Sequence, residues 1–359
     1  ADVMMLPPGY VLTRKACVRG NSMIKPSSLP WKTGDAKLLD TRLAEAVASH
    51  LPSDLPFATF FSGGIDSTLI AHYAHRLYPR APGYFAGNET APDYPFAAEY
   101  AEMNGYDLRV VPLDPAAMFA RIPEALAAAE SFEPNLIRSA VSTLAVAEQM
   151  HADGLRIALC GEGADELFCG YAPLELSFLD GNEAGRPVRA ETIEMMNRVC
   201  LQRVDRCSMH YQLETRVPFL DPAVASYALS LDASALVRVA DGVRYGKVPL
   251  RALYDLYPDE LPKSIRDRSK MPFDDGCGLD AKPKDSVWKT GFNEAVSDAD
   301  FEDAKKEFAD FLPQSKEEVY YLRHLSQVMD IRRVPHMKGR AWITTPLDRY
   351  SEQLKAHAL

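Results

Sequence analysis

The chain has 359 residues, of which 47% are apolar and 25% are charged, and its 40 Lys and Arg against 50 Asp and Glu give a formal net charge of −10. Length and composition exclude wholesale disorder and a small disulfide- or metal-stapled module, because this profile is typical of a globular protein that buries a sizeable core. The acidic balance argues against broad contact with nucleic-acid phosphates or anionic lipid, although a local basic pocket is compatible with it.

The first residues and the cysteines predict a soluble cytoplasmic protein. Residues 1–15 lack the basic, apolar and cleavage regions of a signal peptide, and no apolar run approaches the ~20 residues that span a bilayer. The six cysteines form no CxxC pair, which indicates reduced thiols, and the eight histidines form no HxH or HExxH pattern. We therefore expect no membrane, no nucleic-acid partner and no zinc site.

Predicted strands alternate with predicted helices through the first half of the chain. After a lead-in over residues 1–32 with little periodicity, the expected elements are a helix at 35–50, a strand at 57–61, a helix at 68–74, a strand at 83–86, a helix at 95–103, a strand at 108–113, helices at 115–129 and 137–150, and a strand at 157–160. This alternation predicts an α/β fold with a doubly wound parallel sheet, whose ligands lie at the carboxyl ends of the strands. From about residue 191 the pattern is mostly helical, and this part either covers the sheet or forms a lobe beside it.

A glycine loop follows the first strand of the alternation. Its members Ser62, Gly63, Gly64, Asp66 and Ser67 stand at a strand-to-helix turn, where glycines let the backbone approach an anion and the hydroxyls and helix N-terminus add donors. The loop therefore suits a phosphate or pyrophosphate, and Asp66 fits there if Mg²⁺ bridges it to a nucleotide. The structural alternative is a tight turn in which Asp66 is an ordinary helix cap.

A second loop, the segment CGEGADELFCGY at residues 160–171, follows the strand predicted at 157–160. Glu162, Asp165 and Glu166 place three carboxylates within five residues, which is costly unless a cation or a proton-transfer role offsets their repulsion. The structural alternative is a solvated acidic loop. We prefer the functional interpretation because both loops leave the same edge of the predicted sheet.

Two further segments have weaker signals. ETRVPFLD at residues 214–221 is on its own typical of a structural pair between Arg216 and a carboxylate. The second segment is a group of Lys and Arg residues that could stabilise an oligophosphate leaving group. The alternative is that these residues form a solvated basic face. The members of the group are Arg244, Lys247, Arg251, Lys263, Arg266, Arg268 and Lys270.

These segments, taken in chain order, resemble the synthetase domain of the asparagine synthetase B family, which also includes the β-lactam synthetases and the lasso-peptide cyclases. SGGIDS matches the family's SGGxDS loop, CGEGADELFCGY matches SGEGSDEvFgGY and ETRVPFLD matches E-x-R-x-PFLD, while GKVPLR and KMPFDDGCG resemble GKxxLR and K-x-x-F-x-D-G. The resemblance implies an adenine nucleotide alpha hydrolase fold of the ATP-pyrophosphatase type over residues 33–359, with a sheet core at about 55–175 and a mostly helical part at about 176–359.

The resemblance also implies ATP and Mg²⁺ as cofactors. It places at the nucleotide the residues Phe60, Phe61, Ser62, Gly63, Gly64, Asp66, Ser67, Ala86, Cys160, Gly161 and Lys247, with the pyrophosphate on the glycine loop and the adenine near Phe60, Phe61, Ala86 and Cys160. Asp66 and Asp165 would hold Mg²⁺, and Lys270 would stabilise the departing pyrophosphate. Glu162 would be the base, and Glu214 would orient or support that step.

The implied reaction is AMP-forming amide synthesis. A small, aspartate-like carboxylate would attack the α-phosphate of ATP, and ammonia or another amine would then displace AMP from the acyl-adenylate. The alternatives are an intramolecular β-lactam-forming synthetase of secondary metabolism, including antibiotic biosynthesis, and a non-catalytic ATP-binding partner subunit. Glu162 favours intermolecular amidation, because β-lactam synthetases carry Tyr at this position of the motif.

One departure from the family concerns the amine. The family's asparagine synthetases begin with a glutaminase domain whose nucleophile is an N-terminal Cys, whereas this sequence starts with Ala1 and its first cysteine is Cys17. Residues 1–32 resemble the linker after that domain. We therefore expect no glutamine hydrolysis by this chain, with ammonia or an amine supplied by solution, a separate glutaminase subunit or the substrate itself. Self-association into a homo-oligomer is an open option.

Overall fold

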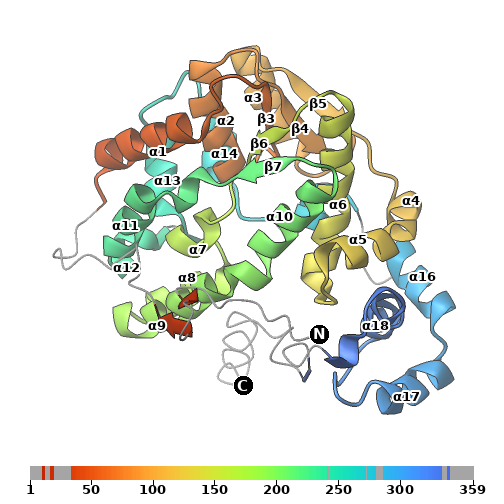
Figure 1. Ribbon diagram of the computed structural model, residues 1–359. Coiled ribbons are helices and arrows are strands. Elements are labelled where there is room, and N and C mark those ends of the chain that lie inside the picture. The colour runs from red at the N-terminus through yellow and green to blue at the C-terminus, as the bar shows by residue number, and fades with distance from the viewer. Residues whose placement is uncertain are drawn as a thin grey trace.

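A computed structural model describes residues 10–12, 17–19, 34–240, 242–271, 273–279, 286–333 and 338–339 (Figure 1). Most of the predicted lead-in lies outside these residues, as does the end of the predicted helical part from residue 340. Within the lead-in, β1 (Tyr10–Leu12) pairs antiparallel with β2 (Cys17–Arg19), a short ladder that the weak periodicity did not predict.

The core of the protein is a five-stranded parallel sheet in the order β5-β4-β3-β6-β7. Its strands are β3 (Phe57–Phe60), β4 (Gly83–Ala86), β5 (Leu108–Val111), β6 (Ile157–Leu159) and β7 (Glu214–Arg216). The predicted doubly wound sheet is confirmed, and four of its strands lie where the sequence placed them. The chain leaves β3 toward β4 on one side and β6 lies on the other, so the strand order reverses between β3 and β6, where such sheets bind ligands.

Successive side chains of a strand point to opposite faces of the sheet and belong to two different hydrophobic clusters. Phe57, Phe85 and Ile157 belong to one buried cluster, whereas Ala58 and Tyr84 belong to the other. Burying a side chain of the size of Phe or Ile stabilises the fold by about 1.5–3 kcal/mol. The apolar residues on both faces therefore determine which face of the sheet each strand residue points to.

Helices cover both faces of the sheet. The first cluster is completed by α1 (Ala36–His50), α2 (Ile65–Leu77) and α3 (Tyr94–Asn104), and the second by α5 (Ile122–Ala129), α6 (Pro134–Ala152) and α10 (Cys200–His210). The single helix predicted at 115–129 is two helices, α4 (Pro115–Ala120) and α5, because Pro123 lies in the first turn of α5 and cannot donate back to the preceding turn.

The remaining described elements are mostly short helices. The second loop contains α7 (Ala164–Phe168), and α8 (Ala172–Leu179), α9 (Asn182–Met195) and η1 (Met196–Arg198) follow it. After β7 come η2 (Pro218–Leu220), α11 (Pro222–Ser230), α12 (Ala233–Leu236), the antiparallel pair β8 (Arg238–Ala240) and β9 (Val243–Tyr245), α13 (Val248–Tyr254), α14 (Lys263–Asp267), α15 (Phe273–Gly276), α16 (Val287–Ala295), α17 (Asp298–Glu307), α18 (Lys316–Val328) and η3 (Ile331–Arg333).

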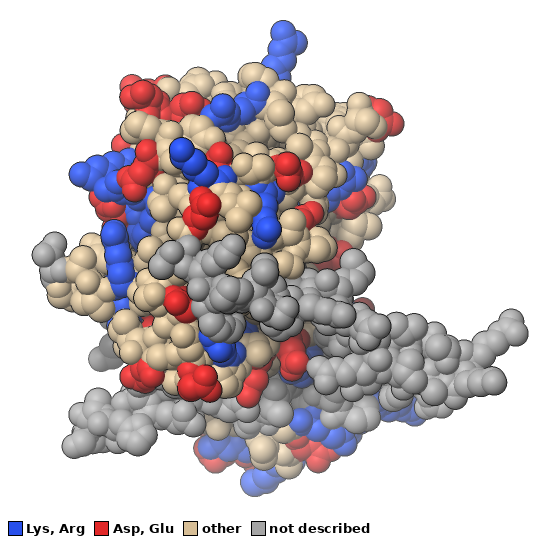
Figure 2. All heavy atoms as spheres, turned by 90° about the vertical axis from the view of Figure 1, so that its left-hand side faces the viewer, with Lys and Arg blue, Asp and Glu red and all other residues tan. Residues whose placement is uncertain are grey.

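The last helices, α16 to α18, pack beside α4 and α5 at the lower right of Figure 1 and share the second hydrophobic cluster with α5 and α6. On the face shown in Figure 2, basic and acidic side chains are interspersed and do not gather into one basic patch. Across the described part of the chain, no helix combines the length and the apolar character that crossing a membrane requires.

Candidate active site

A cavity of about 430 Å³ lies where β3, β4 and β6 reach their carboxyl ends. The predicted site residues that line it are Phe60, Phe61, Ser62, Gly64, Asp66, Ser67, Ala86, Cys160, Gly161, Glu162, Asp165, Lys247 and Lys270. Gly63 lies in the same loop without being part of the lining, and Glu214 lies elsewhere. The structure therefore brings nearly all of the predicted residues together from segments far apart in the sequence.

The glycine loop joins β3 to α2 in a tight turn. Gly63 has a φ of +68°, and a Cβ added there would lie 2.5 Å from the backbone nitrogen of Ala97, so this position requires glycine. Within the turn, the Ser67 hydroxyl accepts a hydrogen bond from the Ser62 amide at 3.1 Å, and the two hydroxyls lie 3.0 Å apart.

The first turn of α2 carries no side-chain cap. Its N-cap is Gly64, which makes no side-chain hydrogen bond, and Asp66 lies one residue inside the helix. The interpretation of Asp66 as an ordinary helix cap is therefore wrong. The first residues of α2 line the cavity, and the partial positive charge of a helix N-terminus favours an anion there.

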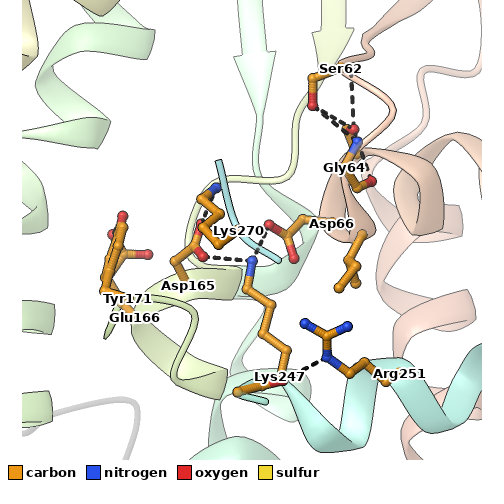
Figure 3. Close-up of polar contacts among 12 residues, drawn as sticks. Ser62, Gly64, Asp66, Asp165, Glu166, Tyr171, Lys247, Arg251 and Lys270 are labelled. Atoms are coloured by element: carbon orange, nitrogen blue, oxygen red, sulfur yellow. Dashed lines mark hydrogen bonds and ion pairs between the residues drawn. The ribbon is translucent and has the colours of Figure 1, made fainter. Parts of the chain in front are cut away.

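Two aspartates and two lysines alternate in a row of ion pairs within the cavity (Figure 3). The Lys247 ammonium lies between two carboxylates, 2.5 Å from Asp66 Oδ2 and 2.6 Å from Asp165 Oδ1. The Lys270 ammonium lies 2.9 Å from Asp165 Oδ2. Both aspartate side chains are only 12% exposed, so each carboxylate depends on a lysine as its counter-charge.

These contacts set the charge states of the groups. Burial raises the pKa of Asp66, although the Lys247 ammonium opposes the rise. Burial also tends to raise the pKa of Asp165, but the charges of Lys247 and Lys270 outweigh burial and lower this pKa to about 2. Burial would lower the pKa of Lys270, yet the two carboxylates raise it above its usual value. Asp165 and Lys270 are therefore a charged pair at neutral pH.

The second loop is buried rather than solvated. It leaves β6 at Cys160 and turns into the short helix α7, which contains Asp165 and Glu166, and both of these side chains are buried. The alternative of a solvated acidic loop is therefore wrong. Burial raises the pKa of the Cys160 thiol to about 12, which keeps this lining residue neutral.

Close packing at Gly170 holds Asp165 and Lys247 in place. A Cβ added at Gly170 would lie 1.8 Å from Asp165 Oδ1 and 2.2 Å from Lys247 Cε. Lys247 itself has a φ of +54°, and its amide donates to the Phe168 carbonyl at 2.9 Å, which ties the start of α13 to the second loop. The position of the Lys247 ammonium is thus fixed by backbone geometry as well as by charge.

Glu162 forms an ion pair with Arg203, which the sequence analysis did not identify. Arg203 lies on α10, and its second nitrogen donates to the Thr143 hydroxyl of α6 at 3.0 Å. The glutamate side chain is 21% exposed and lines the cavity. No motif surrounds Arg203, so only the packing of α10 against α6 could have located it.

Glu166 is the third carboxylate of the second loop. One of its oxygens accepts from the Tyr171 hydroxyl at 2.9 Å, and its other oxygen, Oε2, is buried without a hydrogen-bond partner. Burial, together with the charges of Asp165 and Glu162, raises its pKa to about 7.

We expect Glu166→Gln to stabilise the protein in a pH-dependent way when no nucleotide or metal is added. Because the folded-state pKa is raised above the usual 4.5, ionising Glu166 costs stability progressively as the pH rises from about 4.5 to about 7. The glutamine stays neutral and escapes this cost, which is on the order of 3 kcal/mol above about pH 7. Urea unfolding of the parent and the variant at about pH 5 and about pH 8 measures this cost. A stability difference between the two proteins that does not change with pH would contradict a raised pKa for Glu166.

Glu214 does not belong to the cavity, which corrects its predicted catalytic role. It is the first residue of β7 and pairs in register with Ile157, the first residue of β6, so it lies at the amino end of the sheet. Its side chain is 60% exposed and accepts from Arg216 at 2.8 Å. Since the ligands of such a sheet bind at the carboxyl ends, we do not retain Glu214 as a site residue.

The predicted basic group divides between the cavity and the surface. Lys247, Arg251, Arg268 and Lys270 line the cavity, whereas Arg266 pairs with Asp255 and Asp267 on the exterior. Arg268 donates to the Gly63 carbonyl at 3.1 Å, and so supports the glycine loop from behind.

A divalent cation fits the two aspartates. Asp66 Oδ1 is buried without a hydrogen-bond partner, and hard cations such as Mg²⁺ bind carboxylate oxygens. Over the described ranges, no cluster of three or more His, Cys, Asp or Glu side chains could hold a metal. Further ligands for Mg²⁺ would therefore come from phosphate and water, as is usual for this ion.

Comparisons with known proteins agree with this geometry. The family model described as asparagine synthase matches residues 38–194 and 182–330. The chain is 28% identical over 343 residues to an asparagine synthetase (glutamine-hydrolyzing) of Brassica oleracea, covering 88% of this chain and 56% of that protein. It is 27% identical over 366 residues to a probable asparagine synthetase (glutamine-hydrolyzing) of Schizosaccharomyces pombe, covering 91% and 62%. The chain thus spans somewhat more than half the length of these relatives.

Proposed function

The chain belongs to the asparagine synthase family, and from that premise we propose that it is an ATP-dependent, AMP-forming carbon–nitrogen ligase. The observation that carries the proposal is the set of charges formed by Asp66, Asp165, Lys247 and Lys270 beside a glycine loop at a helix N-terminus. We also propose that residues 33–359 form one synthetase domain.

The proposed first step activates a carboxylate. A substrate carboxylate oxygen attacks the α-phosphorus of ATP, the bond from that phosphorus to the bridging oxygen breaks, and pyrophosphate leaves with the electron pair. The glycine loop and the α2 N-terminus would bind the pyrophosphate, and Lys270 would stabilise the charge that develops on it. The adenine would lie against Phe60, Ala86 and Cys160, which line the cavity.

Asp66 and Asp165 would hold Mg²⁺, which when bound supplies positive charge to the phosphates. Lys247 already provides a cation between the same two carboxylates. Lys247 therefore favours the ionised form of both aspartates and holds them in place before substrates arrive, because the two carboxylates would otherwise repel one another at close range.

The proposed second step forms the amide. Ammonia or another amine attacks the acyl carbon, the tetrahedral intermediate loses a proton, and the carbon–oxygen bond to AMP breaks. Glu162 is our proposed proton acceptor because it lines the cavity and is partly exposed. Arg203 and Thr143 would position its carboxylate, so Arg203 is a positioning residue rather than one that touches the reacting atoms.

We expect Gly170→Ala to slow ATP–pyrophosphate exchange by about 10²-fold. The added methyl group meets the ends of two side chains, so the chain escapes the clash only by displacing Asp165 and Lys247 from the phosphate site. Gly34→Ala is the matched control, since its Cβ would lie at an ordinary 3.4 Å from the Tyr227 hydroxyl. An exchange rate for Gly170→Ala within about twofold of the parent would contradict this placement.

The overall proposal is tested by incubating the protein with ATP, Mg²⁺, ammonium and a panel of carboxylic acids that includes monocarboxylates and aspartate. We expect AMP and pyrophosphate as products, whereas ADP and phosphate would contradict the proposal. Glutamine in place of ammonium, with and without a separate glutaminase, identifies the nitrogen source. A product that has lost water from a single substrate, with no need for ammonium, would identify the intramolecular lactam-forming alternative, and ATP binding without turnover would identify a partner subunit.

A further inference from the structure

Part of the cavity wall is formed by residues of α6, α9, η1 and α10, and we call the space that they line the acyl chamber. Its apolar lining residues are Leu136, Val146, Met195, Met196, Val199 and Val204. Met195 and Val199 are partly exposed, whereas Leu136, Val146, Met196 and Val204 are more deeply buried, with exposures of only 1–4%. This part of the cavity wall is therefore apolar, and its two methionines can adapt to more than one ligand shape.

The described residues of α6, α9, η1 and α10 bring little charge to this chamber. Arg203 is the one charged lining residue on these four elements, and it is bonded to Glu162 and Thr143. The other polar groups of these helices are neutral: Asn135, Ser139, Thr143 and Thr192, with the thiol of Cys200. Burial raises the pKa of Cys200 well above its usual value, so that thiol is neutral too.

This distribution disfavours a second anionic group on the substrate. The carboxylates near the chamber, Glu162 and Glu166, would repel it, and Arg203 already has an acidic partner. Removing a carboxylate from water without a counter-charge is strongly unfavourable. An apolar body gains instead, because each buried methylene improves binding by about fourfold.

Building on the proposed function, we propose that the acid activated here is a monocarboxylic acid with an apolar aliphatic or aryl-alkyl body, bound in the acyl chamber. The reactive carboxylate would lie near Lys270 and Glu162, and the body would extend toward Met195, Met196 and Val199. The chemistry of the lining thus separates this substrate class from dicarboxylates such as aspartate.

The test measures ATP–pyrophosphate exchange by the whole protein, using pairs of a monocarboxylic and a dicarboxylic acid with the same number of carbon atoms. Butanoate is compared with succinate and hexanoate with adipate, and phenylpropanoate and aspartate complete the panel. We expect kcat/KM to be about 10²-fold higher for the monocarboxylate of each pair and to rise about fourfold per added methylene until the chamber is full.

A charge introduced into the chamber should reverse this preference. Val199→Lys is expected to lower the ratio of butanoate to succinate activity by at least about tenfold, whereas Val239→Lys, on the exposed surface of β8, should leave the ratio unchanged. Equal or better exchange with succinate or aspartate in the unaltered protein would overturn the inference and leave the ligase proposal standing. No exchange with any acid of the panel would overturn both.

Discussion

Asp165→Asn is expected to reduce ATP–pyrophosphate exchange by about 10³-fold. The substitution keeps the size of the side chain but removes the charge that faces Lys247 at 2.6 Å and Lys270 at 2.9 Å. Two ammonium groups are then left with Asp66 as their remaining carboxylate partner, and one proposed Mg²⁺ ligand is lost. Because the pKa of Asp165 is about 2, the same group should cause no loss of exchange in the parent protein down to about pH 5.

The matched control for this variant is Asp255→Asn, which removes a charge of the same type from a carboxylate that is 61% exposed and paired with Arg266. Its exchange rate should stay within about twofold of the parent. Thermal unfolding of both variants shows whether each remains folded. A folded Asp165→Asn protein with near-parental exchange would remove Asp165 from the proposed phosphate chemistry.

Glu162→Gln is expected to slow amide formation by about 10²-fold while leaving ATP–pyrophosphate exchange largely intact. Exchange requires only the activated carboxylate, whereas amide formation requires loss of a proton from the incoming amine. Glutamine still accepts a hydrogen bond from Arg203 but is no base, so the variant separates positioning from proton transfer. Product formation and exchange are measured on the same preparation.

A surface glutamate provides the control here. Glu148→Gln alters a carboxylate that is 52% exposed and paired with Arg121, and it should change neither rate. Equal losses of exchange and amide formation in Glu162→Gln would mean that Glu162 acts in activation or in metal binding, and the base would then have to be sought elsewhere in the cavity.

Sequence patterns located the sheet well where its strands are apolar. The ranges expected for β3, β4, β5 and β6 agree with the structure to within two residues at either end. The strands β3, β4 and β6 are short, mostly buried apolar runs, whereas β5 is an edge strand with Arg109 in it and was located by its β-branched residues. β7 escaped detection, since three residues of sequence Glu-Thr-Arg have neither length nor apolar character to distinguish them from a loop.

The candidate site was predictable to the extent that its residues follow strands. Asp66 and Asp165 each lie just after a strand end, so the parallel topology brings them together. Arg203 was missed because a helix contributes it and tertiary packing alone decides what it faces. Glu214 was misplaced because membership of a motif does not say at which end of a strand a residue lies.

The contact between Lys247 and Asp66 joins residues 181 positions apart in the chain. The entropy of closing such a loop must be overcome before the contact contributes any stability, which places it among the slow events of folding. The proposed nucleotide pocket is complete only when both the sheet and α13 have docked, and a chain that ends before α13 would have the glycine loop but not its buried ammonium. If the chain binds a nucleotide as proposed, binding regained during refolding reports native topology rather than secondary structure.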